Sequence, residues 1–367
     1  MLDDSKRHFR TSRISAFNHR KPDQVFTDSL RKIRAFFRWS NLKRLAKALF
    51  QGGIQAALLA WRDRRRETLP DDVTHTFRAR AYPGSRTRRY LVHVPHGKAD
   101  RRPRPLVVVL HGCRQDNRDI ERISGFNELA DRRGFLVAYP FVTSYRGMRN
   151  RNCWGWWFDR EIHAGAGEVE DLWQIVEEIK QHYSVDPDRI HVTGLSSGAG
   201  MAVAMMVAHA DKIASGAAVA GVPYAEKADA VRHEFNRTPR NRPVVAIVKA
   251  MRNEMGDAAR IVPIQIVHSK NDDKVDINAA SVLRDSWGHC FGVDTRHAYK
   301  ITSGNAKGTA WQHSQYLDDT GKSIIETMFL EGPGHGWYGG NPGNFSFPDA
   351  PDIKGEIWKF FVSHRLR

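Results

Sequence analysis

The chain has 367 residues, enough for one large domain with an appendage or for two modest domains. Hydrophobic residues make up 41% of it, with 18 Phe and 10 Trp, which excludes an intrinsically disordered protein despite 27% charged residues. The formal net charge of +16 is concentrated near the N-terminus, because residues 1–70 contain 17 Lys and Arg against 6 Asp and Glu, a net +11. The rest of the chain is only mildly basic, so the N-terminal part is the one expected to meet a polyanion or an anionic surface.

The N-terminus lacks the pattern of a secretory leader, a basic segment followed by a continuous apolar run and a small-residue cleavage site. No run approaches the roughly eighteen apolar residues that a membrane span requires. Cys113, Cys153 and Cys290 are too few for a disulfide scaffold and form no C-x-x-C pair. These patterns favour a reducing cytoplasm, where cysteines usually stay reduced.

Residues 1–70 are predicted to form a basic helical arm. Apolar side chains recur at helical spacing over residues 26–49, among seven Arg and Lys, and again over residues 54–66 after a Gly-Gly pair. An amphipathic helix usually buries its apolar face on its own protein, so the arm is expected to pack on the rest of the chain. The alternative is an arm that binds a hydrophobic granule or an anionic membrane surface.

From residue 71 onward the sequence alternates between strand and helix patterns. Strands are predicted over residues 75–81 and 88–94, as an antiparallel pair, and over 105–110, 135–139, 190–192, 216–221, 264–267 and 326–330. Helices are predicted over residues 120–133, 168–180, 199–208, 246–255 and 352–364. The alternation predicts an α/β fold, with a mostly parallel, doubly wound sheet and antiparallel N-terminal strands, which matches the α/β-hydrolase layout.

Residues 222–262 interrupt this alternation between two predicted strands and are rich in Arg, Asn and Pro. We expect them to form an inserted cap beside the active site, with a plain excursion of the chain as the alternative. The predicted division is therefore an arm over residues 1–70 and an α/β domain over residues 71–367.

A G-x-S-x-G motif at residues 194–198 follows a predicted strand and precedes a small-residue helical run. A tight turn from strand to helix lifts a serine hydroxyl clear of a sheet, and glycines on both sides leave room for the neighbouring backbone. The motif alone is a weak signal, but this context makes Ser196 a candidate nucleophile.

A serine hydroxyl becomes a good nucleophile when a histidine takes its proton and a carboxylate orients that histidine. In the chain order Ser, Asp, His, both partners follow later strands of the sheet. Asp272 is the first carboxylate after the strand ending at residue 267, with Asp273 and Asp276 as alternatives. His335 lies in a glycine-lined loop after the last predicted strand and is the candidate base.

The negative charge that develops during acyl transfer needs two backbone N–H donors. Ser197, directly after the candidate nucleophile, supplies one, and Cys113, in the turn after the strand over residues 105–110, supplies the other. His111 in the same turn is expected to be a core histidine that fixes the loop rather than a catalytic group.

Four segments together resemble the poly(3-hydroxybutyrate) depolymerase family of esterases, which also contains feruloyl and acetyl-xylan esterases. They are L-H-G-C-R-Q at 110–115, N-C-W-G-W-W at 152–157, G-L-S-S-G-A-G-M at 194–201 and G-H-G-W-Y-G-G at 334–340. The resemblance covers about residues 75–365 and leaves the basic arm outside. It implies a serine esterase in which Ser196, Asp272 and His335 form the triad and Cys113 and Ser197 form the oxyanion hole.

The substrate implied by this resemblance is a polyhydroxyalkanoate, such as poly(3-hydroxybutyrate), or its oligomers. Feruloyl or acetyl-xylan esters are the alternative substrates. An alternative function of another class is that the chain binds a granule or membrane surface through its basic arm. Tryptophan is mostly a core residue, but an apolar cleft for an acyl chain also needs aromatic walls. The candidates for substrate contact are Trp154, Trp156, Trp157 and Trp337.

The expected location is cytoplasmic or granule-associated, with an extracellular location as the alternative because many members of the family are secreted. Cys113 and Cys153 both lie in the family segments, and a bridge between them is an open alternative, but in a cytoplasmic protein they are expected to stay reduced. No P-loop, H-E-x-x-H or G-x-G-x-x-G opening a βαβ unit is present, so no metal or cofactor is expected. Nucleic acid is not an expected partner, since the aromatic residues of the arm lie at helical core spacing.

Overall fold

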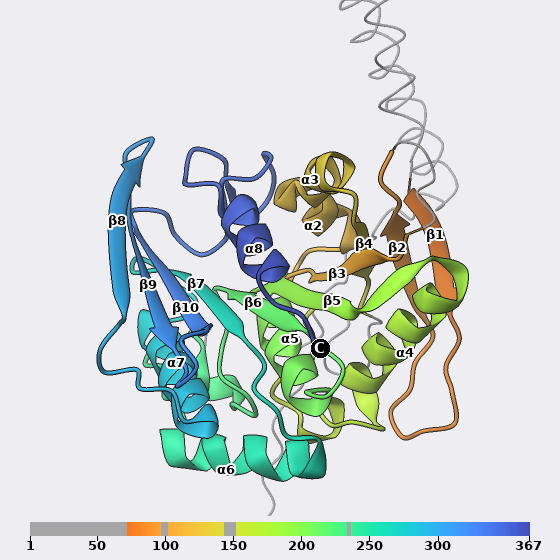
Figure 1. Cartoon of the computed structure of the whole chain (residues 1–367), viewed down its shortest axis with the longest axis horizontal. Helices are drawn as coiled ribbons and strands as arrows, with labels where there is room; N and C mark the ends of the chain where they lie inside the picture. Colours follow the sequence, from red (N-terminus) through yellow and green to blue (C-terminus); the bar gives the residue numbers. More distant parts are fainter. Residues whose placement is uncertain (1–71, 97–101, 143–151, 233–235) are drawn as a thin grey trace, which may run out of the picture. The chain divides into compact units, whose positions relative to one another are not determined.

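The computed structural model describes residues 72–96, 102–142, 152–232 and 236–367. These residues belong to one unit, in which helices cover both faces of a central sheet (Figure 1). The predicted arm over residues 1–70 lies outside the described residues, and its boundary stays a prediction.

The central sheet has ten strands in the order β1-β2-β4-β3-β5-β6-β7-β10-β9-β8. The six central strands, β4, β3, β5, β6, β7 and β10, run parallel to one another. The two strands at each end, β1 and β2 on one side and β9 and β8 on the other, pair antiparallel with their neighbours. Their bounds are β1 Asp72–Phe77, β2 Arg88–His93, β3 Arg104–Leu110, β4 Leu136–Pro140, β5 Val185–Leu195, β6 Ser215–Val219, β7 Ile264–Ser269, β8 Lys300–Ala306, β9 Thr309–Leu317 and β10 Ser323–Glu331. A separate pair joins β11 (Trp337–Tyr338) to β12 (Ser346–Phe347).

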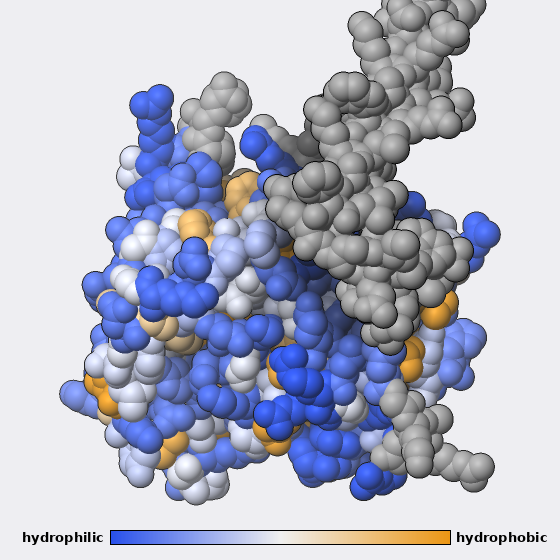
Figure 2. Space-filling view, turned by 90° about the horizontal axis from the view of Figure 1, so that it is seen from above, coloured by the Kyte–Doolittle hydropathy of each residue, from blue (hydrophilic) through white to orange (hydrophobic). Residues whose placement is uncertain are grey.

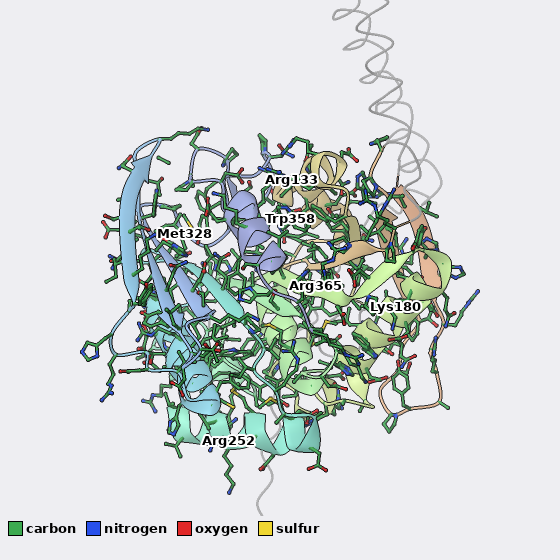
Figure 3. All side chains as sticks on the ribbon, viewed as in Figure 1. Arg133, Lys180, Arg252, Met328, Trp358 and Arg365 are labelled. Atoms are coloured by element: carbon green, nitrogen blue, oxygen red, sulfur yellow. A yellow bond between two sulfur atoms is a disulfide. The ribbon has the colours of Figure 1, made fainter. Side chains whose placement is uncertain are left out.

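A layer of helices covers each face of the sheet (Figure 1). A cluster of buried apolar side chains fills the space beneath each layer. On the first face, Trp358, which is labelled in Figure 3, stacks on Phe135 with their ring centroids 3.9 Å apart. The first layer is α2 Asn117–Ser124, α3 Phe126–Arg133 and α8 Ile353–Val362, and the second is α4 Gly167–His182, α5 Ser197–Ala208, α6 Val244–Met255 and α7 Ile277–Phe291.

The outer surface of this unit is largely polar on the face shown in Figure 2, where hydrophobic residues are scattered singly or in small groups. Among the described helices, none is both long enough and apolar enough to cross a membrane.

The predicted mostly parallel sheet with an antiparallel N-terminal pair is confirmed, but three elements differ from the prediction. The helix predicted over residues 120–133 is two helices, because Gly125 adopts a left-handed φ of 66° between α2 and α3. The sequence pattern does not predict α7 or the β8–β9 hairpin at the sheet edge. The hairpin strands carry many exposed polar side chains, so they contain no apolar run that would mark a strand.

Residues 222–262 connect β6 to β7, and their C-terminal half is α6. Ile247 and Met251 of α6 are fully buried in the core, so this half is a crossover helix of the kind that joins parallel strands. The N-terminal half of the segment passes beside the cavity described below. Its action as a cap stays a prediction.

A buried charge cluster ties β2 to α4. Arg88 of β2 donates a hydrogen bond from Nε to Asp171 at 2.7 Å, and its Nη1 lies 3.6 Å from Glu168, with all three side chains fully buried. Burial raises the pKa of Glu168 to about 7, against the opposing charge of Arg88. Removing the cation would therefore leave buried carboxylates without their partner.

We predict that Arg88→Met lowers the free energy of unfolding by about 3 kcal/mol, because it leaves Asp171 and Glu168 buried without the cation that offsets their charge, even though other donors still bind them. Chemical denaturation measures the change. The control is Arg80→Met, which removes an ion pair with Glu178 that is partly exposed and 3.3 Å long, and should cost less than about 1 kcal/mol. If both variants lose the same free energy of unfolding, the buried cluster stabilises the fold no more than the exposed ion pair does, and the prediction is wrong.

Candidate active site

Ser196 lies on the turn between β5 and α5. Its backbone has φ 57° and ψ −116°, in the positive-φ region that residues other than glycine rarely adopt. Its N–H donates to the carbonyl of Val219 at 2.9 Å, which anchors the turn to β6. A Cβ at Gly198 would collide with the backbone at the end of β3, and a Cβ at Gly194 would collide with Gly198 itself. Only glycine fits at these two positions, in agreement with the sequence analysis.

The structure brings Asp272 and His335 together from two different loops. His335 Nδ1 lies 2.7 Å from Asp272 Oδ2, and their side chains are 8% and 0% exposed. Asp272 Oδ1 accepts the backbone N–H groups of Lys274 and Val275, each at 2.8 Å. Burial alone would raise the pKa of Asp272, but the hydrogen bond from His335 and the nearby histidine charges hold it below its ordinary value. Asp272 is thus an ionised carboxylate directed at one imidazole.

His268 is a second imidazole beside this carboxylate, and the sequence analysis does not single it out. Its Nε2 lies 2.8 Å from the carbonyl of Val275 and 3.6 Å from Asp272 Oδ2. Burial lowers the pKa of His268, against the opposing charge of Asp272 and the contact with the Val275 carbonyl. The one sequence signal for it is its place at the end of a buried strand, four residues before Asp272.

The loops that carry Asp272 and His335 are also joined by contacts that involve neither side chain. The side chain of Asn271 accepts the N–H of Gly332 at 2.8 Å, and Ser269 Oγ donates to the carbonyl of Pro333. These bonds fix the relative position of the loops, so the imidazole and the carboxylate are oriented in advance.

The two alternative carboxylates make other contacts. Asp273 is exposed and pairs with the neighbouring lysine at 2.7 Å. Asp276 caps the N-terminus of α7 and forms an ion pair with Arg232 at 2.8 Å. Asp272 is therefore the one of the three that the structure places against His335.

A cavity of about 800 Å³ has both Ser196 and His335 in its wall. The candidate oxyanion residues Cys113 and Ser197 line the same cavity. Ser197 is the first residue of α5, so its N–H has no partner within the helix. The apolar part of the wall consists of Trp156, Trp157, Leu195, Val222, Ala228, Val231, Val275 and Phe345.

The loop after β3 is fixed by two side chains. His111 is fully buried and its Nε2 accepts the N–H of Val142 at 3.2 Å; burial lowers the pKa of His111 to about 4. Gln115 accepts the N–H of Gly112 at 2.8 Å and donates to the carbonyl of Asn344 at 3.0 Å. His111 thus has the structural position expected of a core histidine.

Cys113 and Cys153 form a disulfide, with their Cα atoms 4.2 Å apart. The expectation that they stay reduced is wrong for this structure, because the turn after β3 folds directly against the N-C-W-G-W-W segment. The bridge links a candidate oxyanion residue to the aromatic part of the cavity wall. Cys290 is a free, half-buried thiol.

Only two of the four candidate tryptophans line the cavity. Trp156 and Trp157 do so, with their rings in an edge-to-face contact at 5.1 Å. Trp154 and Trp337 are fully buried and belong to the two core clusters on opposite faces of the sheet, so neither can form the wall of a cleft. The substrate contact predicted for these two residues is corrected to core packing.

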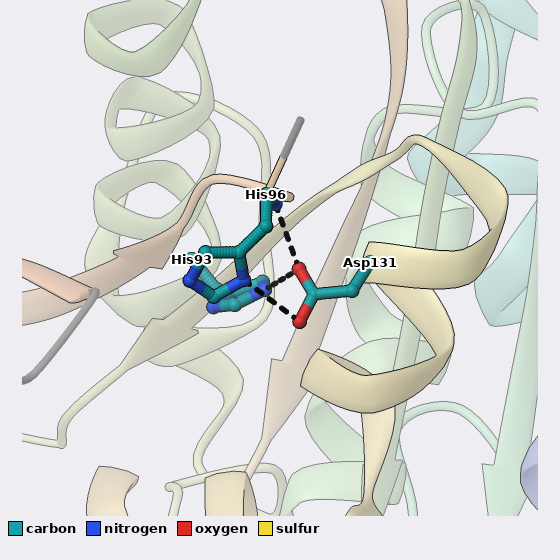
Figure 4. Close-up of side chains that lie close together, drawn as sticks. All are labelled: His93, His96 and Asp131. Carbon is teal, nitrogen blue, oxygen red and sulfur yellow. Dashed lines mark hydrogen bonds and ion pairs between the residues drawn. The ribbon is translucent and has the colours of Figure 1, made fainter. Parts of the chain in front are cut away.

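His93, His96 and Asp131 form the group with metal-ligand chemistry in the described part of the chain (Figure 4). The carboxylate lies 2.9 Å from His93 Nε2 and 3.0 Å from His96 Nδ1. Burial would raise the pKa of Asp131, but hydrogen bonds from the two histidines hold it below its ordinary value. None of the three side chains lines the cavity that contains Ser196.

Comparison with known proteins relates the chain to ester hydrolases. The family model described as Esterase PHB depolymerase matches residues 88–297. A poly(3-hydroxyalkanoate) depolymerase C of Paucimonas lemoignei is 31% identical over 253 residues, which are 66% of this chain and 57% of that protein. An acetylxylan esterase of Coprinopsis cinerea is 26% identical over 63% of this chain and 61% of that protein. The chain thus spans less than two thirds of the length of these two relatives.

Among solved structures, an acetyl xylan esterase from Aspergillus awamori matches with a TM-score of 0.58 at 18% sequence identity. The match covers 79% of this chain and 99% of that one. This likeness confirms the α/β-hydrolase fold that the order of strands and helices predicts.

The disulfide predicts the number of reactive thiols. The denatured, unreduced chain should show one thiol per molecule, from Cys290, and three after reduction, as counted with a thiol-reactive dye. Cys153→Ser should lower the free energy of unfolding by about 3 kcal/mol, because the bridge closes a long loop of the unfolded chain. Cys290→Ser is the control for removing a thiol without removing a bridge. Three reactive thiols before reduction would contradict the assignment.

Proposed function

Because the chain belongs to the PHB depolymerase esterase family, we propose that it is a serine esterase that works through an acyl-enzyme. The proposed substrate is a polyhydroxyalkanoate, such as poly(3-hydroxybutyrate), or its oligomers. The observation that carries the proposal is the His335 imidazole, held by Asp272 at 2.7 Å, in the wall of the same cavity as Ser196.

In the proposed reaction Ser196 Oγ attacks the ester carbonyl carbon while its proton passes to His335 Nε2. The N–H groups of Cys113 and Ser197 donate to the oxyanion that forms. The tetrahedral intermediate collapses with cleavage of the bond to the alcohol oxygen, which takes the proton from His335. Water then attacks the acyl-enzyme in the same way and releases the acid. Asp272 keeps the proton on Nδ1 of the base and stabilises the imidazolium.

A feruloyl or acetyl-xylan type carboxylesterase is the second candidate function. It is supported by the acetylxylan esterases among the matching proteins. The rings of Trp156 and Trp157 in the cavity wall suit an aromatic or a short aliphatic acyl group equally well. Both candidates use the same chemistry and differ only in the acyl and alcohol parts of the ester.

For the arm, we propose that residues 1–70 bind an anionic membrane or the surface of a polymer granule. The net charge of +11 and the amphipathic pattern of this segment support the idea, since basic amphipathic helices bind such surfaces.

For the location of the protein, we propose the extracellular alternative over the cytoplasm. The disulfide between Cys113 and Cys153 supports it, because disulfides persist in oxidising compartments.

We predict that Ser196→Ala abolishes hydrolysis of p-nitrophenyl butyrate, with kcat at least about 10⁴-fold lower, because the nucleophile is lost. The matched control is Ser303→Ala on the exposed strand β8, which should keep full activity. Circular dichroism checks that both variants are folded. Activity retained by folded Ser196→Ala would overturn the mechanism.

The substrate class is tested with wild-type protein on a panel of 3-hydroxybutyrate oligomers, methyl ferulate and acetylated xylan. Polyhydroxyalkanoate chemistry predicts the highest kcat/KM on the oligomers. A clear preference for ferulate or acetylated xylan would move the chain to the second candidate function.

For the arm, we predict that replacing Arg31, Lys32, Arg34 and Arg38 with Gln in the full chain weakens co-sedimentation with vesicles that contain phosphatidylglycerol. Each basic residue near an anionic surface contributes about 1 kcal/mol, so the loss should be large at low salt. The control changes four basic residues of the α/β domain, namely Arg132, Arg133, Arg296 and Arg367. Unchanged sedimentation of the arm variant would remove surface binding from the proposal.

A further inference from the structure

The cavity that contains Ser196 has a strongly asymmetric charge. Four cationic side chains line it, whereas none of its described lining residues is Asp or Glu. Arg114, Arg237 and Lys274 are exposed, so these charges lie where the cavity opens to solvent. The cations are Arg114, Arg232, Arg237 and Lys274.

Two of these four cations are neutralised by neighbouring carboxylates. Arg232 pairs with Asp276 at 2.8 Å, and Lys274 pairs with Asp273 at 2.7 Å. In the described ranges of the chain, neither Arg114 nor Arg237 forms an ion pair with a carboxylate. Among the described residues, these two guanidinium groups therefore present positive charge to the cavity without a carboxylate partner.

Arg114 is held on a fixed piece of backbone. Its φ of 63° is in the left-handed region, where glycine is the least strained residue, yet this position carries a long charged side chain. The preceding residue, Cys113, is bonded to Cys153 by the disulfide. In the following residue, Gln115, both the oxygen and the nitrogen of the side-chain amide form hydrogen bonds. The base of the Arg114 side chain is thus fixed beside Cys113, the candidate oxyanion donor.

We propose that this cationic wall binds a carboxylate of the substrate, so that the preferred esters carry a free acid group. The inference rests on the proposed esterase function and narrows its substrate class. Guanidinium groups bind carboxylates through two parallel hydrogen bonds, and Arg114 and Arg237 supply that chemistry. Linear hydroxyacid oligomers end in such a carboxylate.

In a 3-hydroxybutyrate oligomer the terminal carboxylate is separated by only two carbons from the oxygen of the last ester bond. When Ser196 attacks that ester, the carboxylate belongs to the leaving alcohol and lies within the same cavity. An internal ester bond of a long polymer has no carboxylate at this position, because the next group along the chain is another neutral ester. The cationic wall thus favours acid-terminated oligomers over internal bonds of the polymer.

The test compares two trimers of 3-hydroxybutyrate, one with a free terminal acid and one capped as a primary amide of nearly the same size. Wild-type protein should cleave the acid trimer with kcat/KM about tenfold higher at low ionic strength, the size expected for two partly exposed charge pairs. The ratio of the two kcat/KM values should fall as salt is added, because exposed charges are screened.

The double variant Arg114→Gln/Arg237→Gln should bring this ratio close to one. The control, Arg132→Gln/Arg133→Gln, makes the same change in net charge at the C-terminal turn of α3, where neither residue lines the cavity, and should keep the ratio. Circular dichroism and the melting temperature establish that both variants are folded.

Equal kcat/KM for the two trimers in wild-type protein would overturn the carboxylate site and leave the esterase function standing. A ratio that falls as much in the control variant would assign the preference to overall charge and also overturn the site. If neither trimer nor p-nitrophenyl butyrate is hydrolysed, the proposed function itself fails.

Discussion

The hydrogen bond between Asp272 and His335 is the contact on which the arrangement of the site depends. The two residues are 63 positions apart in sequence, but the strands that precede them, β7 and β10, are parallel neighbours, so both loops begin at the same edge of the sheet. The backbone N–H groups after Asp272 occupy one carboxylate oxygen and leave the other for the imidazole. Because a buried carboxylate without its partners is costly, separation of the loops would expose it or leave it unpaired.

The order of the strands places the remaining groups around this pair. β5 pairs with β3, so the turn at Ser196 lies beside the loop that carries Cys113. The close approach requires Gly198, since any side chain there would meet the end of β3. The disulfide then attaches the same loop to the segment of Trp156 and Trp157. Nucleophile, oxyanion loop and aromatic wall are therefore positioned by backbone contacts, one covalent bond and the buried side chains of His111 and Gln115.

The sequence predicts those parts of the site that follow buried strands, because apolar runs mark the strands and chain order then assigns the loops. It does not predict what depends on three-dimensional proximity. Trp154 and Trp156 are two residues apart in one aromatic segment, yet one is in the core and the other lines the cavity. The pairing of Cys113 with Cys153 and the contact of His268 with Asp272 likewise arise only when distant segments meet. The β8–β9 hairpin is missed for a different reason, namely its polar strands.

Under the two proposals, positive charge has two separate roles in this molecule. The sequence concentrates a net +11 in residues 1–70, and charge of that kind attracts an anionic surface over about one Debye length, near 10 Å at 0.1 M salt. Arg114 and Arg237 of the cavity wall would bind a carboxylate at contact distance through oriented hydrogen bonds, so salt weakens that binding less than it weakens binding of the arm to a surface. Net charge alone cannot separate these roles, because it counts Arg31 and Arg114 equally. What the structure adds for Arg114 is its place in the wall of the cavity that contains Ser196, which the sequence alone does not give.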